Sequence, residues 1–401
     1  MSTAGRLVTL VLVTPDGTLV GALPPFPVEA PWWPEAHDVV RGARERYGVD
    51  VIVLRLLEVD AEEAFGGSVT YLAEVAAPVV AARWNGKLAE HPLRQPWARP
   101  GGPSTDLAWA AAALREGGFG PVETAQQIRT WNLSSLWRLE ADGRAIWLKV
   151  VPSFFAHEGA LLERLQGGPV PTLIARSGGR SLLAEVPGTD QYEAETSLER
   201  LLEMVDVLIP LQREWTSRAE ELLRLGLPDF RAGELIPAIA DLFDRDISDV
   251  GAENRATLAA FLRDLASRMA ALAATGLPDT LVHGDFIGGN FRGDGDSLIL
   301  LDWGDSGVGH PLLDMAAFLE RVPGEHAAAV RDHWHEAWRA AVPGSDPALA
   351  AQLIAPIAAA RQALIYRRFL DAIEPSEHPY HRNDPALWLR KTAAIVRSST
   401  A

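Results

Sequence analysis

The stretch from residue 281 to residue 305, LVHGDFIGGNFRGDGDSLILLDWGD, constrains the fold more than any other part of the chain. Two apolar runs with the composition of buried strands each end in acidic residues, and a glycine-rich loop separates them. A buried strand rarely ends in carboxylates without a partner, because burying an isolated ionised carboxylate is costly. We therefore expect Asp285, Asn290 and Asp302 to share a cation.

Within this stretch, FRGDGDSLILLD predicts a hairpin that turns at residues 293–297. With the turn centred at residue 296, Asn290 and Asp302 lie opposite each other at the open end of the hairpin. Asp285 reaches the same end from the loop that follows the strand TLVH. An amide oxygen facing a carboxylate forms an oxygen-rich site suited to Mg²⁺, which also binds water and substrate phosphates. A further carboxylate nearby can accept a proton from a hydroxyl group.

Length and composition narrow the class of protein. The chain has 401 residues, enough for two or three domains, and its 48% hydrophobic and 22% charged content is typical of a globular protein. Without cysteine it has no disulfides or thiolate metal sites. The net charge of −16 disfavours nucleic acids and anionic membranes as partners. No window offers the roughly 20 apolar residues of a membrane span, so we expect a cytoplasmic protein.

The pattern of elements predicts an α+β protein with three parts. Strand, turn and helix signals alternate through residues 1–98, which we interpret as a small α/β domain ending in a proline-rich connector. Residues 99–186 contain two strands on either side of Asp142–Gly143, a pair that favours a two-residue hairpin turn. Residues 187–401 are mostly helical. We therefore expect a small β-rich lobe followed by a large helical lobe.

An ion pair is predicted within the β-rich lobe. Lys149 lies in an apolar strand, AIWLKVV, where a buried amine needs a negative partner. In the next predicted helix, Glu158 shares its face with apolar residues at helical spacing. These residues are Phe154, Leu161, Leu162 and Leu165. An acid on the core side of this helix is suited to pair with the strand lysine, in either a structural or a catalytic role.

Other charged clusters carry less information. The late helix RQALIYRRFL holds Arg361, Arg367 and Arg368, which we interpret as a solvated or carboxylate-paired face rather than a phosphate site. His333 and His335 are two residues apart on a tryptophan-rich helix, so their side chains diverge and zinc binding is not expected.

The motifs HGDFIGGNF and LLDWGDSGVGHPLLDMAAF resemble those of the aminoglycoside phosphotransferase and choline kinase branch of the protein-kinase-like superfamily. The resemblance covers roughly residues 120–385 and implies a two-lobed kinase-like fold. It implies that Asp285 is the catalytic base and that Asn290 and Asp302 hold Mg²⁺. It also implies that His283 braces the catalytic loop without reacting, and that the aspartate of GHPLLDMA, Asp314, is a structural anchor.

The resemblance also implies a nucleotide site in the β-rich lobe. Lys149, paired with Glu158, would contact the α- and β-phosphates. The backbone carbonyl of Ala184 and the backbone amide of Val186 would bind the adenine edge.

One departure concerns the loop over the phosphates. Protein kinases have a glycine-rich loop there, whereas this chain has TWNLSSLW. Ser134 and Ser135 are candidate phosphate donors, with ordinary turn residues as the alternative.

The N-terminal domain has a weaker resemblance. RGARERYG, at the end of a predicted helix, resembles the last part of the Nudix pyrophosphatase motif, because Arg41, Glu45 and Gly48 fit. Gly42 and Arg46, however, stand where the motif has metal-binding glutamates, so hydrolysis is not expected. We interpret residues 1–98 as a Nudix-like, non-catalytic accessory domain.

Together these features predict ATP- and Mg²⁺-dependent transfer of the γ-phosphoryl group to a hydroxyl of a small molecule, with GTP as an alternative donor. The resemblance allows aminoglycosides, aminosugars and amino alcohols as acceptors, and Asp305, Glu320 or Asp371 are candidates to bind their amines. Two alternatives stay open: a nucleotide-binding regulatory protein without turnover, and a Nudix-type hydrolase. A protein kinase is disfavoured because His-Gly-Asp lacks the arginine that reads a phosphorylated activation loop.

Overall fold

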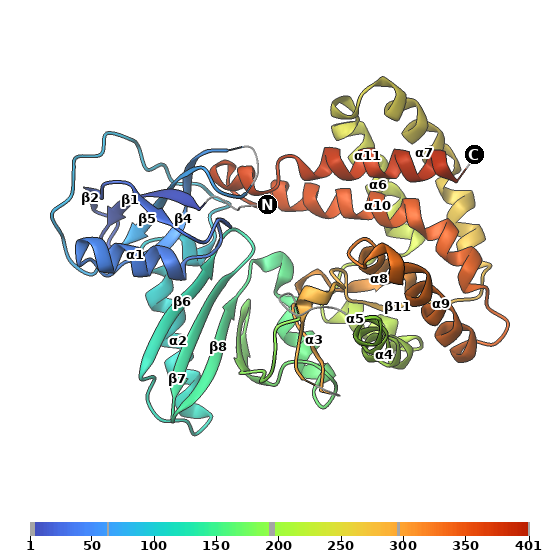
Figure 1. Ribbon diagram of the computed structural model, residues 1–401, viewed down its shortest axis with the longest axis horizontal. Coiled ribbons are helices and arrows are strands. Elements are labelled where there is room, and N and C mark those ends of the chain that lie inside the picture. Colours follow the sequence, from blue (N-terminus) through green and yellow to red (C-terminus); the bar gives the residue numbers. More distant parts are fainter. Residues whose placement is uncertain (1–4, 62–63, 192–196, 295–296, 400–401) are drawn as a thin grey trace. The chain divides into compact units, whose positions relative to one another are not determined.

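The computed structural model describes residues 5–61, 64–191, 197–294 and 297–399 (Figure 1). The chain forms two compact units, each built from segments that are far apart in the sequence. The first unit comprises Met1–Gly159, Leu173–Glu185 and Phe369–Arg382, and the second comprises Ala160–Thr172, Val186–Arg368 and Asn383–Ala401. The α/β domain and most of the β-rich lobe thus belong to one unit, and the division between them stays a prediction.

The first sheet is formed by the N-terminal part of the first unit. Its elements are β1 (Arg6–Val13), β2 (Leu19–Ala22), β3 (Phe26–Val28), α1 (His37–Tyr47), β4 (Ile52–Asp60) and β5 (Ser68–Glu74). The strand order is β2-β1-β5-β4 with β3 also on β1, and the β1–β5 pair is parallel while the others are antiparallel. Buried apolar residues of β1 and β5, such as Val8 and Tyr71, pack with Val39 of α1 in one core.

The second sheet of this unit is wholly antiparallel. Its strands are β6 (Thr124–Thr130), β7 (Ser135–Ala141), β8 (Arg144–Val150), β9 (Leu173–Ser177) and β10 (Arg180–Ala184), in the order β6-β7-β8-β10-β9. The predicted two-residue turn between β7 and β8 is confirmed: Asp142 and Gly143 have φ angles of 53° and 67°, and Ala141 pairs with Arg144. Helix α2 (Gly102–Glu116) packs on this sheet, and α3 (His157–Leu165) follows β8.

A C-terminal segment completes the first unit, although the predicted division at residue 187 assigned it to the helical lobe. The carboxylate of Glu374 accepts three hydrogen bonds from Arg94: Nε to Oε1 at 3.0 Å, Nε to Oε2 at 3.2 Å and Nη2 to Oε2 at 2.9 Å. Glu377 Oε1 accepts from the backbone N–H of Leu56 in β4 at 2.9 Å. Burial raises the pKa of Glu377 to about 8. These buried contacts hold the segment against β4.

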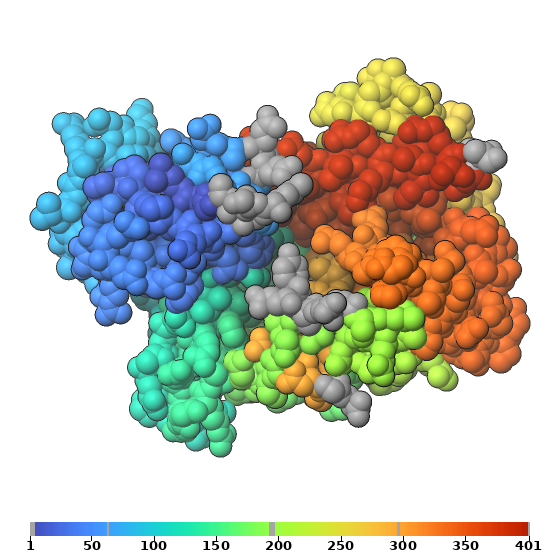
Figure 2. All heavy atoms as spheres, in the orientation of Figure 1, coloured from blue at the N-terminus to red at the C-terminus, as the bar shows by residue number. Residues whose placement is uncertain are grey.

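The second unit is mainly helical. Its longer helices are α4 (Leu198–Trp215), α5 (Ala219–Arg224), α6 (Ala232–Asp246), α7 (Ala252–Ala273), α8 (Leu312–Leu319), α9 (Gly324–Ala341), α10 (Pro347–Ala372) and α11 (Asp384–Ser398). Figure 2 shows α7 packed beside the C-terminal helices, and α7 contacts α11 directly. Short strands interrupt the helices: β11 (Thr280–Val282), β12 (Phe291–Arg292), β13 (Ile299–Leu300) and β14 (Gly307–Gly309). These strands carry the predicted site.

Helix α10 corrects one expectation from the sequence. It has 26 residues, and an 18-residue window within it has a mean hydropathy of 1.5, so by length and composition alone it is apolar enough to cross a membrane. Within this window 56% of the helix is buried inside the protein. Core helices of globular proteins have the same character, so the composition of α10 is weak evidence for a membrane span.

Candidate active site

The loop that carries Asp285 is anchored by one buried carboxylate. Residues 283–285 follow β11, which pairs with β14. Asp314 near the start of α8 is fully buried, and its Oδ2 and Oδ1 accept hydrogen bonds from the backbone N–H groups of His283 and Gly284, both at 2.9 Å. Gln212 of α4 also donates to Oδ2, at 2.9 Å. The prediction that Asp314 is a structural anchor is confirmed, because its carboxylate fixes the backbone next to Asp285.

Gly284 allows two loops to approach each other. Its φ angle is 91°, in the left-handed region that favours glycine. A Cβ atom at this position would lie 2.1 Å from the backbone oxygen of Asp305, closer than any side chain tolerates. The glycine of the His-Gly-Asp motif therefore lets the loop that holds Asp285 contact the loop after Asp302.

His283 joins the same two loops through its side chain. The ring is fully buried and packs edge-on against Trp303, with ring centroids 4.6 Å apart. Its Nε2 is 2.9 Å from the backbone oxygen of Leu301, the residue before Asp302. These contacts confirm that His283 braces the loop that carries Asp285, as predicted.

The predicted register of the hairpin is wrong by one residue. Phe291 pairs with Leu300, and the backbone N–H of Leu301 donates to the oxygen of Asn290 at 2.7 Å, so Leu301 rather than Asp302 lies opposite Asn290. The predicted turn residues 295 and 296 lie outside the described residues. Asp302 instead adopts a left-handed backbone with φ of 59°, rare for a residue other than glycine. This conformation ends the strand alternation on which the predicted register depended.

Asp285, Asn290 and Asp302 nevertheless come together. Asn290 Nδ2 donates to the backbone oxygen of Asp285 at 2.7 Å and to its Oδ2 at 2.9 Å. Burial raises the pKa of Asp285, and the nearby Asp302 carboxylate raises this pKa further, while Arg321 and Arg361 act in the opposite direction. The site therefore combines a partly buried carboxylate, an amide and a second, exposed carboxylate.

The donor set fits a magnesium ion that also binds phosphate. With its Nδ2 directed at Asp285, Asn290 has its amide oxygen available as a ligand, and Asp302 supplies a carboxylate. A divalent cation here would relieve the repulsion between Asp285 and Asp302. Across the described ranges, no three His, Asp or Glu side chains are grouped as a metal site. An ion at this place would need water and phosphate oxygens as further ligands.

The predicted ion pair in the first unit is confirmed. Lys149 Nζ on β8 lies 2.6 Å from Glu158 Oε1 at the start of α3. The side chain of Glu158 is only 3% exposed and that of Lys149 is 14% exposed. The acid therefore fixes the amine while the amine keeps some access to solvent.

More than half of the chain matches a known protein family. The sequence model of the phosphotransferase enzyme family matches residues 124–351. The chain belongs to this family. The α+β, protein-kinase-like fold predicted from the motifs is thereby confirmed, with its β-rich N-terminal region and helical C-terminal part.

Several solved structures are similar to this family member at low identity. The macrolide 2′-phosphotransferase MphH from Brachybacterium faecium is 17% identical with a TM-score of 0.47, over 68% of this chain and 98% of that chain. The aminoglycoside phosphotransferase APH(4)-Ia, in a ternary complex with ADP and hygromycin B, is 20% identical with a TM-score of 0.49, over 72% of this chain and 97% of that one. No curated protein sequence matches the chain.

The remaining predicted nucleotide contacts of this phosphotransferase family member stay predictions. Ser134 Oγ accepts from Trp131 Nε1 at 3.1 Å, and Ser135 Oγ accepts from Trp137 Nε1 at 3.0 Å. Ser135 is only 1% exposed, so Ser134 is the better placed of the two phosphate candidates.

The predicted adenine contacts lie where β10 ends. Ala184 is the last residue of this strand, and both Ala184 and Val186 are partly exposed. The backbone oxygen of Val186 accepts from Arg292 Nε at 2.7 Å. This bond uses the carbonyl and not the amide of Val186, and the roles of the Ala184 carbonyl and the Val186 amide stay predictions.

Sequence reasoning missed Arg361 as a site residue. Of the two alternatives predicted for this face, solvated or carboxylate-paired, the solvated one is wrong for Arg361, which is only 3% exposed. Its guanidinium lies 4.0 Å from the ring centre of Phe230, and its Nη2 is 3.5 Å from the backbone oxygen of Asp305. Burial lowers the pKa of Arg361 to about 10, against the pull of Asp314 and Asp305. The apolar residues around it in the helix were the only sequence signal of this burial.

Proposed function

We propose that this phosphotransferase family member transfers the γ-phosphoryl group of ATP to a hydroxyl group of a small molecule, in a Mg²⁺-dependent reaction. One observation carries the proposal: Asn290 holds Asp285 by hydrogen bonds, and Asp302 lies close enough to raise the pKa of Asp285. GTP is an alternative donor. A cytoplasmic location, where both nucleotides are supplied, follows from this activity.

In the proposed reaction Asp285 positions the acceptor hydroxyl and accepts its proton as the oxygen bonds to the γ-phosphorus. The bond between the γ-phosphorus and the bridging β-oxygen breaks, and ADP leaves. Asn290 and Asp302 would hold the magnesium ion, which neutralises phosphate charge when bound. Lys149, fixed by Glu158, would neutralise charge on the α- and β-phosphates. The anchored loop keeps Asp285 in place, which is the main contribution of the protein to catalysis.

We propose that the Nudix-like part of the chain is a non-catalytic support for the β-rich lobe. Gln127 of β6 exchanges two hydrogen bonds with the backbone of Val53 in β4, at 2.9 Å and 2.7 Å. A Cβ atom on Gly42 would lie 2.7 Å from the ring of Phe26, so packing disfavours a glutamate at this position of the motif. The alternative, Nudix-type hydrolysis, would require release of a nucleoside monophosphate from a dinucleotide.

The test is coupled ADP or GDP release across a panel of hydroxylated amines, sugars and apolar alcohols, with ATP and GTP as donors. We expect Asp285→Asn to lower turnover by about 100-fold or more, because a positioned base contributes 10²–10⁴, while MgATP binding persists. The matched control is Asp241→Asn, a carboxylate 70% exposed on α6, which should leave turnover unchanged.

Two results would contradict the proposal. Either no acceptor raises nucleotide turnover above background, or Asp285→Asn keeps full turnover. MgATP binding without any turnover would favour a regulatory protein instead.

A further inference from the structure

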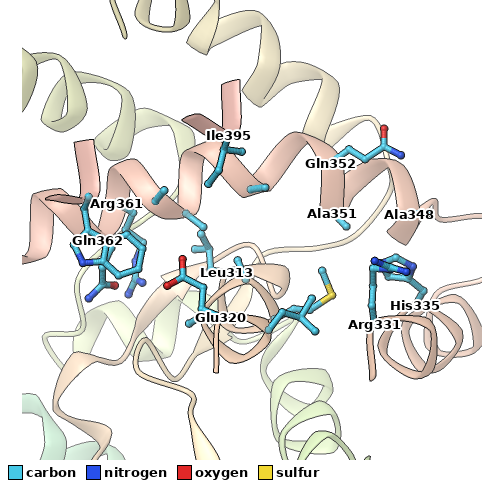
Figure 3. Close-up of a pocket in the computed structure, with 18 of the residues that line it drawn as sticks. Leu313, Glu320, Arg331, His335, Ala348, Ala351, Gln352, Arg361, Gln362 and Ile395 are labelled. Atoms are coloured by element: carbon cyan, nitrogen blue, oxygen red, sulfur yellow. The ribbon is translucent and has the colours of Figure 1, made fainter. Parts of the chain in front are cut away.

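A cavity of about 620 Å³ lies in the second unit, between α8, α9, α10 and α11 (Figure 3). Cavities of roughly 300–1,000 Å³ lined mainly by apolar side chains are typical of small-molecule sites. Its residues all belong to one compact unit, so its shape does not depend on how the two units are arranged.

The wall of the cavity on α10 is made of alanines. Ala348, Ala351, Ala355 and Ala358 follow one another at three- or four-residue spacing, so they lie on one face of the helix, and each is only partly buried. Their small side chains leave the cavity open, while the opposite face of α10 is buried inside the protein. The apolar face of α10 that is not buried in the core therefore lines the cavity.

Polar groups stand at the two ends of the cavity. Figure 3 shows Arg361 and Gln362 at one end, and Arg331 and His335 at the other. Arg361 and His335 both line the cavity, and both side chains are more than nine-tenths buried. A ligand with oxygen or other polar atoms at its ends would meet polar side chains at both ends of the cavity.

The carboxylates of the cavity are already paired with cations. Glu320 Oε2 lies 2.8 Å from Lys391 Nζ, and Asp332 Oδ1 lies 3.6 Å from Arg331 Nε. These cations reduce the negative charge that the two carboxylates present to the amines of an aminosugar. An amine near Arg361 would also meet a positive charge.

The Arg361 end of the cavity lies near the catalytic loop. Arg361 Nη2 is 3.5 Å from the backbone oxygen of Asp305 and would lie 3.0 Å from a Cβ atom on Gly284. The charges of Arg361 and of Arg321, which follows the cavity residue Glu320, both act on Asp285. The Arg361 end of the cavity therefore borders the loop that carries Asp285, although Asp285 is not itself among the residues that line the cavity.

We propose that this cavity binds the phosphoryl acceptor, and that the acceptor is a small hydroxylated molecule with an apolar body and an oxygen for Arg361 rather than a polycationic aminosugar. This inference rests on the proposed function and narrows its substrate class. The apolar body would lie along the alanines of α10, and the hydroxyl to be phosphorylated would be at the Arg361 end, which borders the loop that carries Asp285.

The test combines a binding probe with turnover in the full-length protein. 8-Anilinonaphthalene-1-sulfonate, an apolar fluorophore with one anionic group, serves as the probe, and unfolding temperatures check that each variant is folded. Ala355→Trp and Ala351→Trp fill the cavity from two places on α10. The matched control, Ala328→Trp, adds the same side chain at an exposed position of α9 outside the cavity.

We expect the probe to bind wild-type protein and to be displaced by neutral apolar alcohols that are also phosphorylated. Either cavity variant should lose probe binding and raise the KM for the acceptor at least tenfold, with the KM for ATP unchanged. Ala328→Trp should behave as the wild type.

Failure of this inference differs from failure of the proposed function. If a polycationic aminosugar is the best acceptor and its KM is the same in the cavity variants, the assigned substrate class is wrong. If the probe and the alcohols bind but no acceptor is phosphorylated, the proposed function is wrong, and with it the assignment of the cavity ligand as an acceptor.

Discussion

Replacing Asp314 by alanine tests how the catalytic loop is held. The change removes the acceptor of three hydrogen bonds, from the backbone N–H groups of His283 and Gly284 and from Gln212. Hydrogen bonds to a charged group contribute about 1.5–3 kcal/mol each, and buried donors left without a partner add a penalty. The carboxylate is fully buried, and burial raises its pKa. The cost of keeping this buried group charged therefore offsets part of the stabilisation that the hydrogen bonds provide. We expect a net loss of about 4 kcal/mol in the free energy of unfolding.

The effect on activity should exceed the effect on global structure. A displacement of about 1 Å in a catalytic group can lower the rate about 100-fold, so any Asp314→Ala protein that remains folded should be nearly inactive. Asp314→Asn keeps one side-chain oxygen as an acceptor but places an amide N–H opposite a backbone donor. It should lose about 2 kcal/mol of stability and most of the turnover.

The assay is urea unfolding followed by tryptophan fluorescence, together with hydrogen exchange of the peptide that contains residues 281–292. Exchange of the backbone amides of His283 and Gly284 should accelerate in both variants. Asp241→Ala, at an exposed position of α6, is the control for loss of a carboxylate. The reasoning would be refuted if Asp314→Ala stayed within about 1 kcal/mol of wild type, less than a single charged hydrogen bond, and turned over at a similar rate.

Three further predictions concern single residues. Gly284→Ala should cost about 3 kcal/mol in unfolding free energy and abolish turnover, because its Cβ would lie 2.1 Å from the Asp305 oxygen and its φ is positive. Gly233→Ala is the control: a Cβ atom there would meet no atom within 4 Å, so neither the unfolding free energy nor the turnover should change. Equal melting temperatures for Gly284→Ala and Gly233→Ala would contradict this account. Lys149→Ala should raise the KM for ATP at least tenfold while circular dichroism stays unchanged, and unaltered kinetics would mean that another residue binds the phosphates. Between pH 4.5 and about 8, Glu377 binds its proton more tightly in the folded protein than in the unfolded chain. The free energy of unfolding should therefore fall as pH rises, by up to ~1.4 kcal/mol per pH unit. In Glu377→Gln this slope, measured by urea unfolding, should be smaller; a slope equal to that of wild type would contradict the burial of this carboxyl.

Local features of the fold and of the site were predictable because each depends on residues near one another in the sequence. The Lys149–Glu158 pair spans nine residues and follows from strand and helix periodicity. The Asp142–Gly143 turn follows from the backbone preferences of these two residues. The convergence of Asp285 and Asn290 follows from a loop of five residues.

The hairpin register shows where such reasoning ends. The spacing of Asn290 and Asp302 indicated a common site but left the centre of the turn open by one residue. The left-handed backbone of Asp302 and its neighbour Trp303, which packs on His283, set the position of the carboxylate instead. A one-residue slip normally moves side chains to the other face of a strand, but β12 and β13 have two residues each, too few for alternation to specify their register.

By itself the sequence determined the paired lysine and the family of the fold, and it predicted which residues form the candidate catalytic loop, because these depend on residue types at short, fixed spacings. Only the tertiary structure decided that Arg361 is buried beside the catalytic loop, that the segment around Glu374 belongs to the first unit, and that alanines of α10 line a cavity. Those features depend on contacts between segments far apart in the chain, such as Arg94 with Glu374 across 280 residues. Whether an apolar or charged side chain is buried is set by what packs against it, and local sequence does not contain that information.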